Sequence, residues 1–434
     1  MLPKCLNQPL SYVDSLFVAS SAVSMTGLTP VDVSAVFTPL GWWVLAILME
    51  IGALGVLTFT SFFSLFFTGR PSIYNQLLMR DFIYSKSIGA LVPMVLYILT
   101  FTLAVEAIGA VGLYFTLPGH LFHSTGERIG CAAFHAIAAF TNSGLSTLPD
   151  GVANPALFYG NQLFYLVMTV MIFAGGIGFP NLVNFKDALF QYMLDLRDFL
   201  LRRPQRSRRV HIYDLNTKIV LTTTVSLFVA GAVVFFFLER NHSLAGMPVA
   251  KQVIQSLFYS ATPRSAGFAP INPVAFLSVT QLMLMFLMWI GGSSQSMAGG
   301  IKVNAFGTAI LNLKALICNR RGVSAFHRRI SQASVRRANG TIVLSLLTIV
   351  VVTGVVIGLE PSLGLKSVVF ECLSAVTTNG LSLGATPQLC TISKIILSAA
   401  MFVGRVGLLS VLIGLTHAGR DKSGYYPADE IIIS

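Results

Sequence analysis

A short phrase of polar and small residues, closed by glycine and a large apolar residue, occurs four times in the sequence. Its copies read SMTGL at 24–28, TNSGL at 141–145, RSAGF at 264–268 and TTNGL at 377–381. The side chains before the glycine differ, so the group that all copies share is the backbone carbonyl. Several carbonyl oxygens that converge can replace the hydration shell of a cation. Glycine suits such a segment because it adopts conformations that a Cβ forbids.

Each phrase follows a short amphipathic stretch that is expected to be helical, at 11–22, 128–139, 251–261 and 367–376. A helix of this length measures roughly 15–18 Å, about half of a ~30 Å hydrocarbon core. A half-helix that ends inside a membrane directs the negative end of its dipole at the centre, where four such ends favour a cation. A single glycine in a membrane protein could instead serve close helix packing.

Matched landmarks surround the four phrases and indicate structural repeats. A phenylalanine precedes the glycine by ten residues in three copies and by nine in the third copy, and a proline that stops the helix follows each glycine. These landmarks are Phe17, Phe134, Phe258 and Phe370, and Pro30, Pro149, Pro270 and Pro387.

The composition is that of a membrane protein. The chain of 434 residues has only 11% charged residues and a mean hydropathy of +0.74, which excludes a soluble protein of this size. Seven apolar segments are long enough to span a bilayer, and three of them are interrupted by glycine. They lie at about 41–67, 88–116, 157–185, 219–238, 274–313, 341–359 and 395–416.

These elements predict an all-α integral membrane protein with four helix–pore-helix–helix repeats around one central pore. The expected repeats are 1–80, 81–209, 210–330 and 331–434, the last with the C-terminal tail. Only 26 residues precede Gly27, so the first repeat is expected to lack its leading helix in this sequence, and an eighth span would complete the pattern.

Basic residues cluster in loops, which indicates an orientation in the bilayer better than it indicates nucleic-acid binding. Stretches 197–209 and 314–337 are strongly basic, and 70–86 and 420–422 are mildly so, within a net charge of +12. The positive-inside rule places these loops and the C-terminus in the cytoplasm, and the phrases outside. The basic loops could also bind anionic lipid or a partner.

Five motifs carry a resemblance to a known family. They are DSLFVASSAVSMTGLTP (14–30), TPRSAGF (262–268), WIGGSSQSMAGGIK (289–302), GRVG (404–407) and YYPADEIII (425–433). With them the chain resembles the Trk/Ktr/HKT superfamily of potassium transporters, most closely the Ktr-type membrane subunit that translocates the ion.

The resemblance implies potassium uptake across the cytoplasmic (inner) membrane by a homodimer. It also implies a cytoplasmic nucleotide-binding regulatory subunit of the RCK type, so the nucleotide is bound by the partner and no cofactor is expected on this chain. K⁺ is the expected transported ion, with Na⁺ as a possible coupling ion. Glycine in all four phrases implies potassium selectivity, because a serine in the first phrase goes with sodium preference in plant relatives.

The predicted selectivity filter binds K⁺ through backbone carbonyls. Its residues are Ser24, Met25, Thr26, Gly27, Thr141, Asn142, Ser143, Gly144, Arg264, Ser265, Ala266, Gly267, Thr377, Thr378, Asn379 and Gly380.

A run of small and polar residues interrupts the apolar segment 274–313. No GK[ST] follows it, which argues against a phosphate loop, and the resemblance implies an intramembrane gate. The implied gate residues are Gly291, Gly292, Ser293, Ser294, Gln295, Ser296, Met297, Ala298, Gly299, Gly300, Lys302 and Arg405. Arg405 either repels or times passing cations, or it forms a structural salt bridge or carbonyl clamp, and family analogy favours its contact with this run. For Lys302 the structural alternative is favoured.

Other charged residues predict structural roles. Arg264 is expected to face away from the ion and to bind a carboxylate or carbonyls, with Glu50, Glu106 and Glu371 as candidate partners. Glu106 and Glu371 are each expected to tie a half-helix to its neighbours, and His135 to be a hydrogen-bonding residue. No motif of an enzyme is present. The rival functions are a sodium-selective or sodium-coupled transporter of the same superfamily, a transporter with rocking repeats and a non-transporting scaffold.

Overall fold

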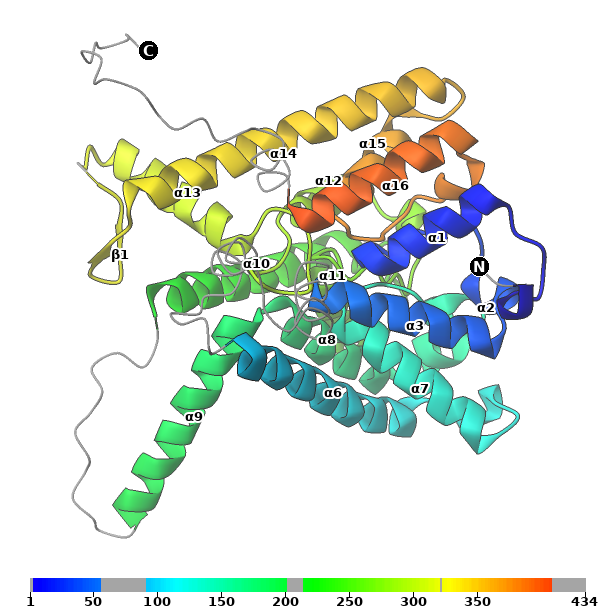
Figure 1. Cartoon of the computed structure of the whole chain (residues 1–434), viewed down its shortest axis with the longest axis horizontal. Helices are drawn as coiled ribbons and strands as arrows, with labels where there is room; N and C mark the ends of the chain where they lie inside the picture. Colours follow the sequence, from blue (N-terminus) through cyan, green and yellow to red (C-terminus); the bar gives the residue numbers. More distant parts are fainter. Residues whose placement is uncertain (1–2, 56–90, 201–213, 321, 408–434) are drawn as a thin grey trace.

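The computed structural model describes residues 3–55, 91–200, 214–320 and 322–407, and these are predominantly helical (Figure 1). In these ranges the only named strands are β1 (Ser324–Ala325) and β2 (Arg328–Arg329), which form an antiparallel hairpin. The basic stretches 70–86 and 420–422, most of 197–209 and the ending 425–433 lie outside the described residues.

The four predicted half-helices are confirmed. They are α1 (Tyr12–Ser24), α7 (Thr125–Phe140), α11 (Val249–Ala261) and α15 (Leu365–Val376). Side-chain caps start two of them, since the Oγ atoms of Ser11 and Ser124 accept hydrogen bonds from the backbone N–H groups of Asp14 and Glu127. The matched phenylalanine of every half-helix is buried, which explains its similar offset from the glycine.

Further α-helices of 12 to 28 residues flank the half-helices. They are α3 (Pro39–Leu54), α6 (Leu91–Thr116), α8 (Gln162–Gly176), α9 (Phe179–Leu200), α10 (Leu215–Glu239), α12 (Ser278–Trp289), α13 (Val303–Ile317), α14 (Gln332–Leu359) and α16 (Thr391–Val406). Short helical turns complete the fold: α2 (Val33–Val36), η1 (Pro3–Cys5), η3 (Gly119–Leu121), η4 (Gly151–Ala153), η5 (Ala156–Gly160), η6 (Pro273–Ala275) and η7 (Thr386–Gln388).

Three described helices are long and apolar enough to cross a membrane unbroken, within Leu96–Thr116, Leu215–Glu239 and Gln332–Leu359. Other predicted spans are shorter or interrupted. The α3 helix stops at Gly55, α8 and α9 are separated at Gly178, and residues 290–302 separate α12 from α13. Both Gly55 and Gly178 have positive φ, so glycine permits the change of direction there.

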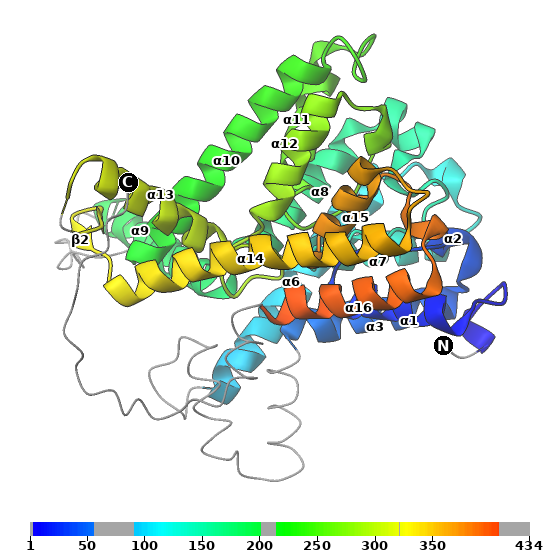
Figure 2. The same cartoon turned by 90° about the horizontal axis from the view of Figure 1, so that it is seen from above.

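The first and last half-helix units are neighbours in space. The α1 helix packs against both α3 and α16, and the two views agree on this arrangement (Figures 1 and 2). An ion pair joins them, with the Lys394 Nζ of α16 2.7 Å from the Asp14 Oδ1 of α1. The first and last of these helices therefore lie side by side, while α9 extends away from the helical bundle (Figure 1).

Candidate functional site

The structure brings the four glycine segments (24–27, 141–144, 264–267 and 377–380) together in a cyclic order. This arrangement of the four segments is called the ring from here on. Each glycine abuts a backbone carbonyl oxygen of the next segment, so closely that a Cβ on the glycine would overlap that oxygen. The four pairs are Gly27 with Ser143, Gly144 with Ala266, Gly267 with Asn379, and Gly380 with Thr26. Equivalent atoms thus meet at all four junctions, and only glycine fits there.

Backbone handedness repeats with the same spacing in all four segments. Positive φ occurs at each glycine and again two residues earlier, with negative φ between them. The earlier residues are Met25, Asn142, Ser265 and Thr378, with φ values of 55°, 57°, 84° and 48°. Left-handed conformations are costly for residues with a Cβ, so four matched instances indicate a backbone shape imposed by the surroundings.

Three half-helices end in the same hydrogen-bonding pattern. The N–H groups of Thr26, Ser143 and Asn379 donate to carbonyls five residues earlier, at 2.8, 2.9 and 2.8 Å, and a left-handed residue precedes each donor. This arrangement closes a helix C-terminus and turns the chain sharply. The carbonyl ends of the half-helices, with their partial negative charge, are thereby held next to the ring.

A second set of glycines supports the half-helices from behind. Gly52 of α3, Gly175 of α8 and Gly404 of α16 each contact a backbone carbonyl at the end of a half-helix, those of Val23, Phe140 and Val376. A side chain at these positions would push the half-helix away from its supporting helix. Close helix packing, the alternative raised for the phrases themselves, is the role of these later glycines.

The ring is accessible from one side of the segments. The three residues before each glycine are buried in all four segments, whereas the glycines themselves are partly exposed. Access therefore lies on the glycine side, and the preceding residues face protein.

Residues 290–302, called the central loop from here on, have an irregular backbone. Its N–H and C=O groups form hydrogen bonds with other parts of the chain. Its ends are held together by the N–H of Gly291, which donates to the carbonyl of Ile301 at 2.9 Å. The N–H groups of Ser293 and Met297 donate to the carbonyls of Gly176 and Gly175 at the end of α8, at 3.0 and 3.2 Å. Irregular backbone at membrane depth requires such partners.

Ser265 connects the central loop directly to two glycine segments. Its Oγ accepts a hydrogen bond from the Gly299 N–H at 2.7 Å and donates to the Thr378 carbonyl at 2.8 Å. Gly299 also lies against the side chain of Thr378, with no space for a Cβ. A movement of the central loop would therefore be transmitted directly to the third and fourth segments.

Two cations clamp the central loop. Arg405 donates from Nη1 to the Met297 carbonyl at 2.5 Å and from Nη2 to the Gly52 carbonyl at 2.9 Å, so it joins α16, the loop and α3. Lys302 donates from Nζ to the Ala298 carbonyl at 2.6 Å. The predicted contact of Arg405 with this run is confirmed, and Lys302 makes the structural contact that was favoured.

Arg264 turns away from the ring, as predicted. Its Nη1 donates to the Thr224 carbonyl of α10 at 3.2 Å, and the guanidinium lies over the Phe173 ring, 5.7 Å from its centroid. The suggestion that Glu50, Glu106 or Glu371 pairs with it is wrong. A carbonyl and an aromatic face take the place of an acid, because a guanidinium binds both.

The three acids have other partners. Glu371 accepts hydrogen bonds from the Ser382 and Thr386 hydroxyls and from the N–H groups of Leu383 and Ala385, so it ties α15 to the loop after the fourth segment, as predicted. Glu50 and Glu106 are close enough to interact with each other, and the Oε1 atom of each is buried without a hydrogen-bond partner among the described residues. For Glu106, the predicted link to a half-helix is replaced by this contact with α3.

His135 is a hydrogen-bonding residue, as predicted. Its ring nitrogens contact the Cys131 carbonyl at 2.9 Å and the Ser146 Oγ at 2.8 Å. Among the described residues, no group of three or more His, Cys, Asp or Glu side chains could hold a metal ion.

Sequence reasoning missed several residues that shape this site. Asn181 donates from its Nδ2 to the Ser293 Oγ at 3.0 Å, and Gly175 and Gly176 supply the carbonyls that receive the central loop. The only available signal was the glycine-rich run AGGIG at 174–178 inside an apolar segment. Ser265 was predicted as a carbonyl ligand, but its hydroxyl contacts could not be read from the sequence.

Comparisons with known proteins agree on one family. The model of the family described as TrkH, cation transport protein, matches residues 2–421. The chain is 30% identical to the potassium/sodium uptake protein NtpJ of Enterococcus hirae, over 97% of this chain and 90% of that protein. It is also 30% identical to the Ktr system potassium uptake protein B of Bacillus subtilis, over 98% and 90% of the two chains.

A solved structure has the same fold. The potassium transporter TrkH from Vibrio parahaemolyticus superposes with a TM-score of 0.71 at 18% identity, covering 94% of this chain and 79% of that one. Identity this low supports the likeness of fold alone.

The contacts at the ring predict different effects for two glycines in one loop. Both Gly380 and Gly384 have positive φ, 96° and 82°, but a Cβ at Gly380 would overlap the Thr26 carbonyl, whereas at Gly384 it meets no described atom within 4 Å. Gly384→Ala should cost about 1–2 kcal/mol from backbone strain alone. Gly380→Ala should cost ~1–3 kcal/mol more, because the fourth segment must move away from the first.

Thermal unfolding of the two detergent-solubilised variants measures this difference. Equal losses of stability for Gly380→Ala and Gly384→Ala would show that the ring contact is not a constraint.

Proposed function

The chain belongs to the TrkH family of cation transport proteins, and from this premise we propose that it takes up potassium across the cytoplasmic membrane through a four-fold pseudosymmetric pore. The observation that carries the proposal is the cyclic contact of four glycines with four equivalent carbonyls. A K⁺ ion exchanges its hydration shell for carbonyl oxygens of this kind, held by backbone that side chains do not crowd. The segments 24–27, 141–144, 264–267 and 377–380 form the selectivity filter in this proposal.

The half-helices supply the electrostatic part of the mechanism. Three of them end in a turn that is closed by an N–H group of the filter segment itself, so their partial negative charge acts on an ion that has lost water. Arg264, the one charged side chain in the four segments, is directed at Thr224 and Phe173, and so does not oppose the ion. The membrane potential favours cation entry by about 2.3 kcal/mol per charge per 100 mV.

The central loop acts as the gate in this proposal. It contacts the third and fourth filter segments through Ser265, and Arg405 holds it to α3 and α16. A cytoplasmic nucleotide-binding subunit of the RCK type would release it, and the transporter would work as a homodimer. The basic loops and the C-terminus would lie in the cytoplasm, and the filter would open to the outside.

One observation favours a second candidate, a sodium-coupled or sodium-permeable transporter of the same family. A relative at 30% identity is named a potassium/sodium uptake protein. Glycine at all four positions of the ring favours potassium, since serine in the first segment is the expected mark of sodium preference.

Ion uptake by proteoliposomes tests the transport proposal. Purified protein should accumulate a rubidium tracer when the vesicles contain potassium, and an equal sodium gradient should drive much less uptake. Gly27→Ser places a side chain against the Ser143 carbonyl, and displacement of this carbonyl ligand should reduce the potassium-to-sodium ratio by about tenfold, or about 1.4 kcal/mol. Gly384→Ser is the matched control, because its surroundings are open. Equal potassium and sodium uptake in the unmodified protein would contradict the proposed selectivity.

Shortening the central loop tests the gate. Deletion of residues 294–296 removes contacts that hold the loop, including the Gln295 carbonyl that accepts from the Phe179 N–H at 3.2 Å. The expected result is faster rubidium uptake without any cytoplasmic partner. Deletion of the turn Gly119–Leu121 between α6 and α7 is the control and should not raise uptake. Unchanged uptake in a folded loop deletion would rule out a gate at this position.

A further inference from the structure

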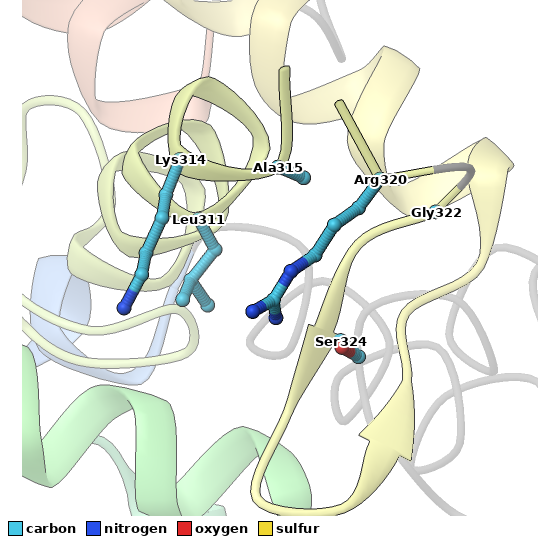
Figure 3. Close-up of a pocket in the computed structure, with 6 residues that line it drawn as sticks. All are labelled: Leu311, Lys314, Ala315, Arg320, Gly322 and Ser324. Carbon is cyan, nitrogen blue, oxygen red and sulfur yellow. The ribbon is translucent and has the colours of Figure 1, made fainter. Parts of the chain in front are cut away.

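A basic cavity lies at the end of α13, far along the chain from the filter segments. It is lined by Leu311, Lys314, Ala315, Arg320, Gly322 and Ser324 and has a volume of about 60 Å³ (Figure 3). Lys314 and Arg320 extend toward the same side, with Leu311 between them (Figure 3). Such a cavity accepts a small, negatively charged group.

Local backbone structure places Lys314 and Arg320 near each other. Lys314 is in the last turn of α13, and Asn319, with a φ of 50°, reverses the chain after the helix. The Arg320 N–H then donates to the Ala315 carbonyl at 2.8 Å, which returns Arg320 to the helix end. The basic cavity is therefore formed by an ordered helix terminus.

The hairpin β1–β2 forms the other wall and has a small core of its own. The Ile330 N–H donates to the Val323 carbonyl at 2.9 Å, and both side chains are buried against Ala315 and Ile219. The Arg329 guanidinium lies over Gly322, where a Cβ would be 2.8 Å from its Nε. A third cation thus stands at the wall of the cavity.

These cations have no carboxylate partner in the described part of the chain. Residues 314–337 contain seven Lys and Arg residues, and no Asp or Glu occurs between Glu239 and Glu360. None of the ion pairs among the described residues involves Lys314, Arg320 or Arg329. Within the described ranges, no acid neutralises the positive charge of Lys314, Arg320 and Arg329.

The size of the basic cavity and the surface around it indicate which kind of anion it binds. The cavity holds on the order of two water volumes, well below the roughly 300 Å³ of a site that encloses a whole small molecule. It therefore takes only the charged end of a ligand. Beside it, α13 exposes an apolar surface, with Leu313, Leu316 and Ile317 58%, 67% and 77% exposed. Acyl chains are the natural cover for such a surface in a membrane protein.

We propose that the basic cavity binds the phosphate of an anionic phospholipid headgroup, with the acyl chains along the exposed face of α13. Lys314 contributes a point charge and Arg320 a planar fork that can donate two hydrogen bonds to phosphate oxygens. The Ser324 hydroxyl, which lines the cavity, can donate a further one. A basic pocket beside membrane helices is a known setting for lipid headgroups.

Lipid titration of the full chain in detergent tests the proposal, with phosphatidylglycerol as the probe and phosphatidylcholine as the uncharged comparison. The double variant Lys314→Gln/Arg320→Gln should weaken phosphatidylglycerol binding by about tenfold or more. The matched control, Arg336→Gln/Arg337→Gln, removes the same charge from exposed positions on α14 outside the cavity and should weaken it far less. Arg320→Lys keeps the charge, loses the fork and should give an intermediate loss.

Two results would overturn the proposal. Equal weakening by both double variants, at unchanged helix content, would mean diffuse attraction to basic residues and no built site. Equal affinity for phosphatidylglycerol and phosphatidylcholine would mean that the cavity does not recognise the net charge of the lipid headgroup. Millimolar inorganic phosphate separates the two possible sources of the group, because displacement of bound lipid would assign the basic cavity to free phosphate instead.

Discussion

The contact of glycine with a neighbouring backbone carbonyl, repeated at four junctions, is the constraint on which the rest of the structure depends. Four chain segments approach one centre so closely that a methyl group on Gly27, Gly144, Gly267 or Gly380 would overlap an oxygen. The half-helices must therefore stop where they do, and the chain must turn through left-handed residues directly afterwards. The glycines of α3, α8 and α16 then let the supporting helices contact the half-helix ends.

The central loop is explained by the same need to satisfy backbone groups away from water. An irregular segment inside a membrane protein is stable only when other parts of the chain bind its N–H and C=O groups. Here α8 accepts two of the N–H groups, Ser265 accepts a third, and Arg405 binds one carbonyl, while Lys302 at the end of the loop binds another. Because these partners come from separate repeats, the central loop links parts of the chain that are distant in sequence.

Much of this arrangement could be predicted from the sequence, because local patterns encode it. Helical periodicity, the phrase glycines and the matched phenylalanines located the half-helices, and the apolar segments located the longer helices. The partners of buried charges could not be predicted, since they depend on how helices pack. Arg264 binds a carbonyl of α10 and an aromatic ring in place of an acid, and Glu50 contacts Glu106 on another helix. The supporting glycines Gly52, Gly175 and Gly404 were also missed. Their distance along the chain from the filter glycine differs between repeats, so no repeated pattern marks them.

The central claim is that a cation binds between carbonyl groups of the four filter segments. Anomalous diffraction from crystals grown with rubidium or thallium in place of potassium tests this claim most directly. The account predicts an anomalous peak at the common centre of the four segments, at a distance from the carbonyl oxygens that suits a dehydrated ion. A peak located only at side chains such as Glu50 and Glu106, with none between the glycine segments, would contradict it.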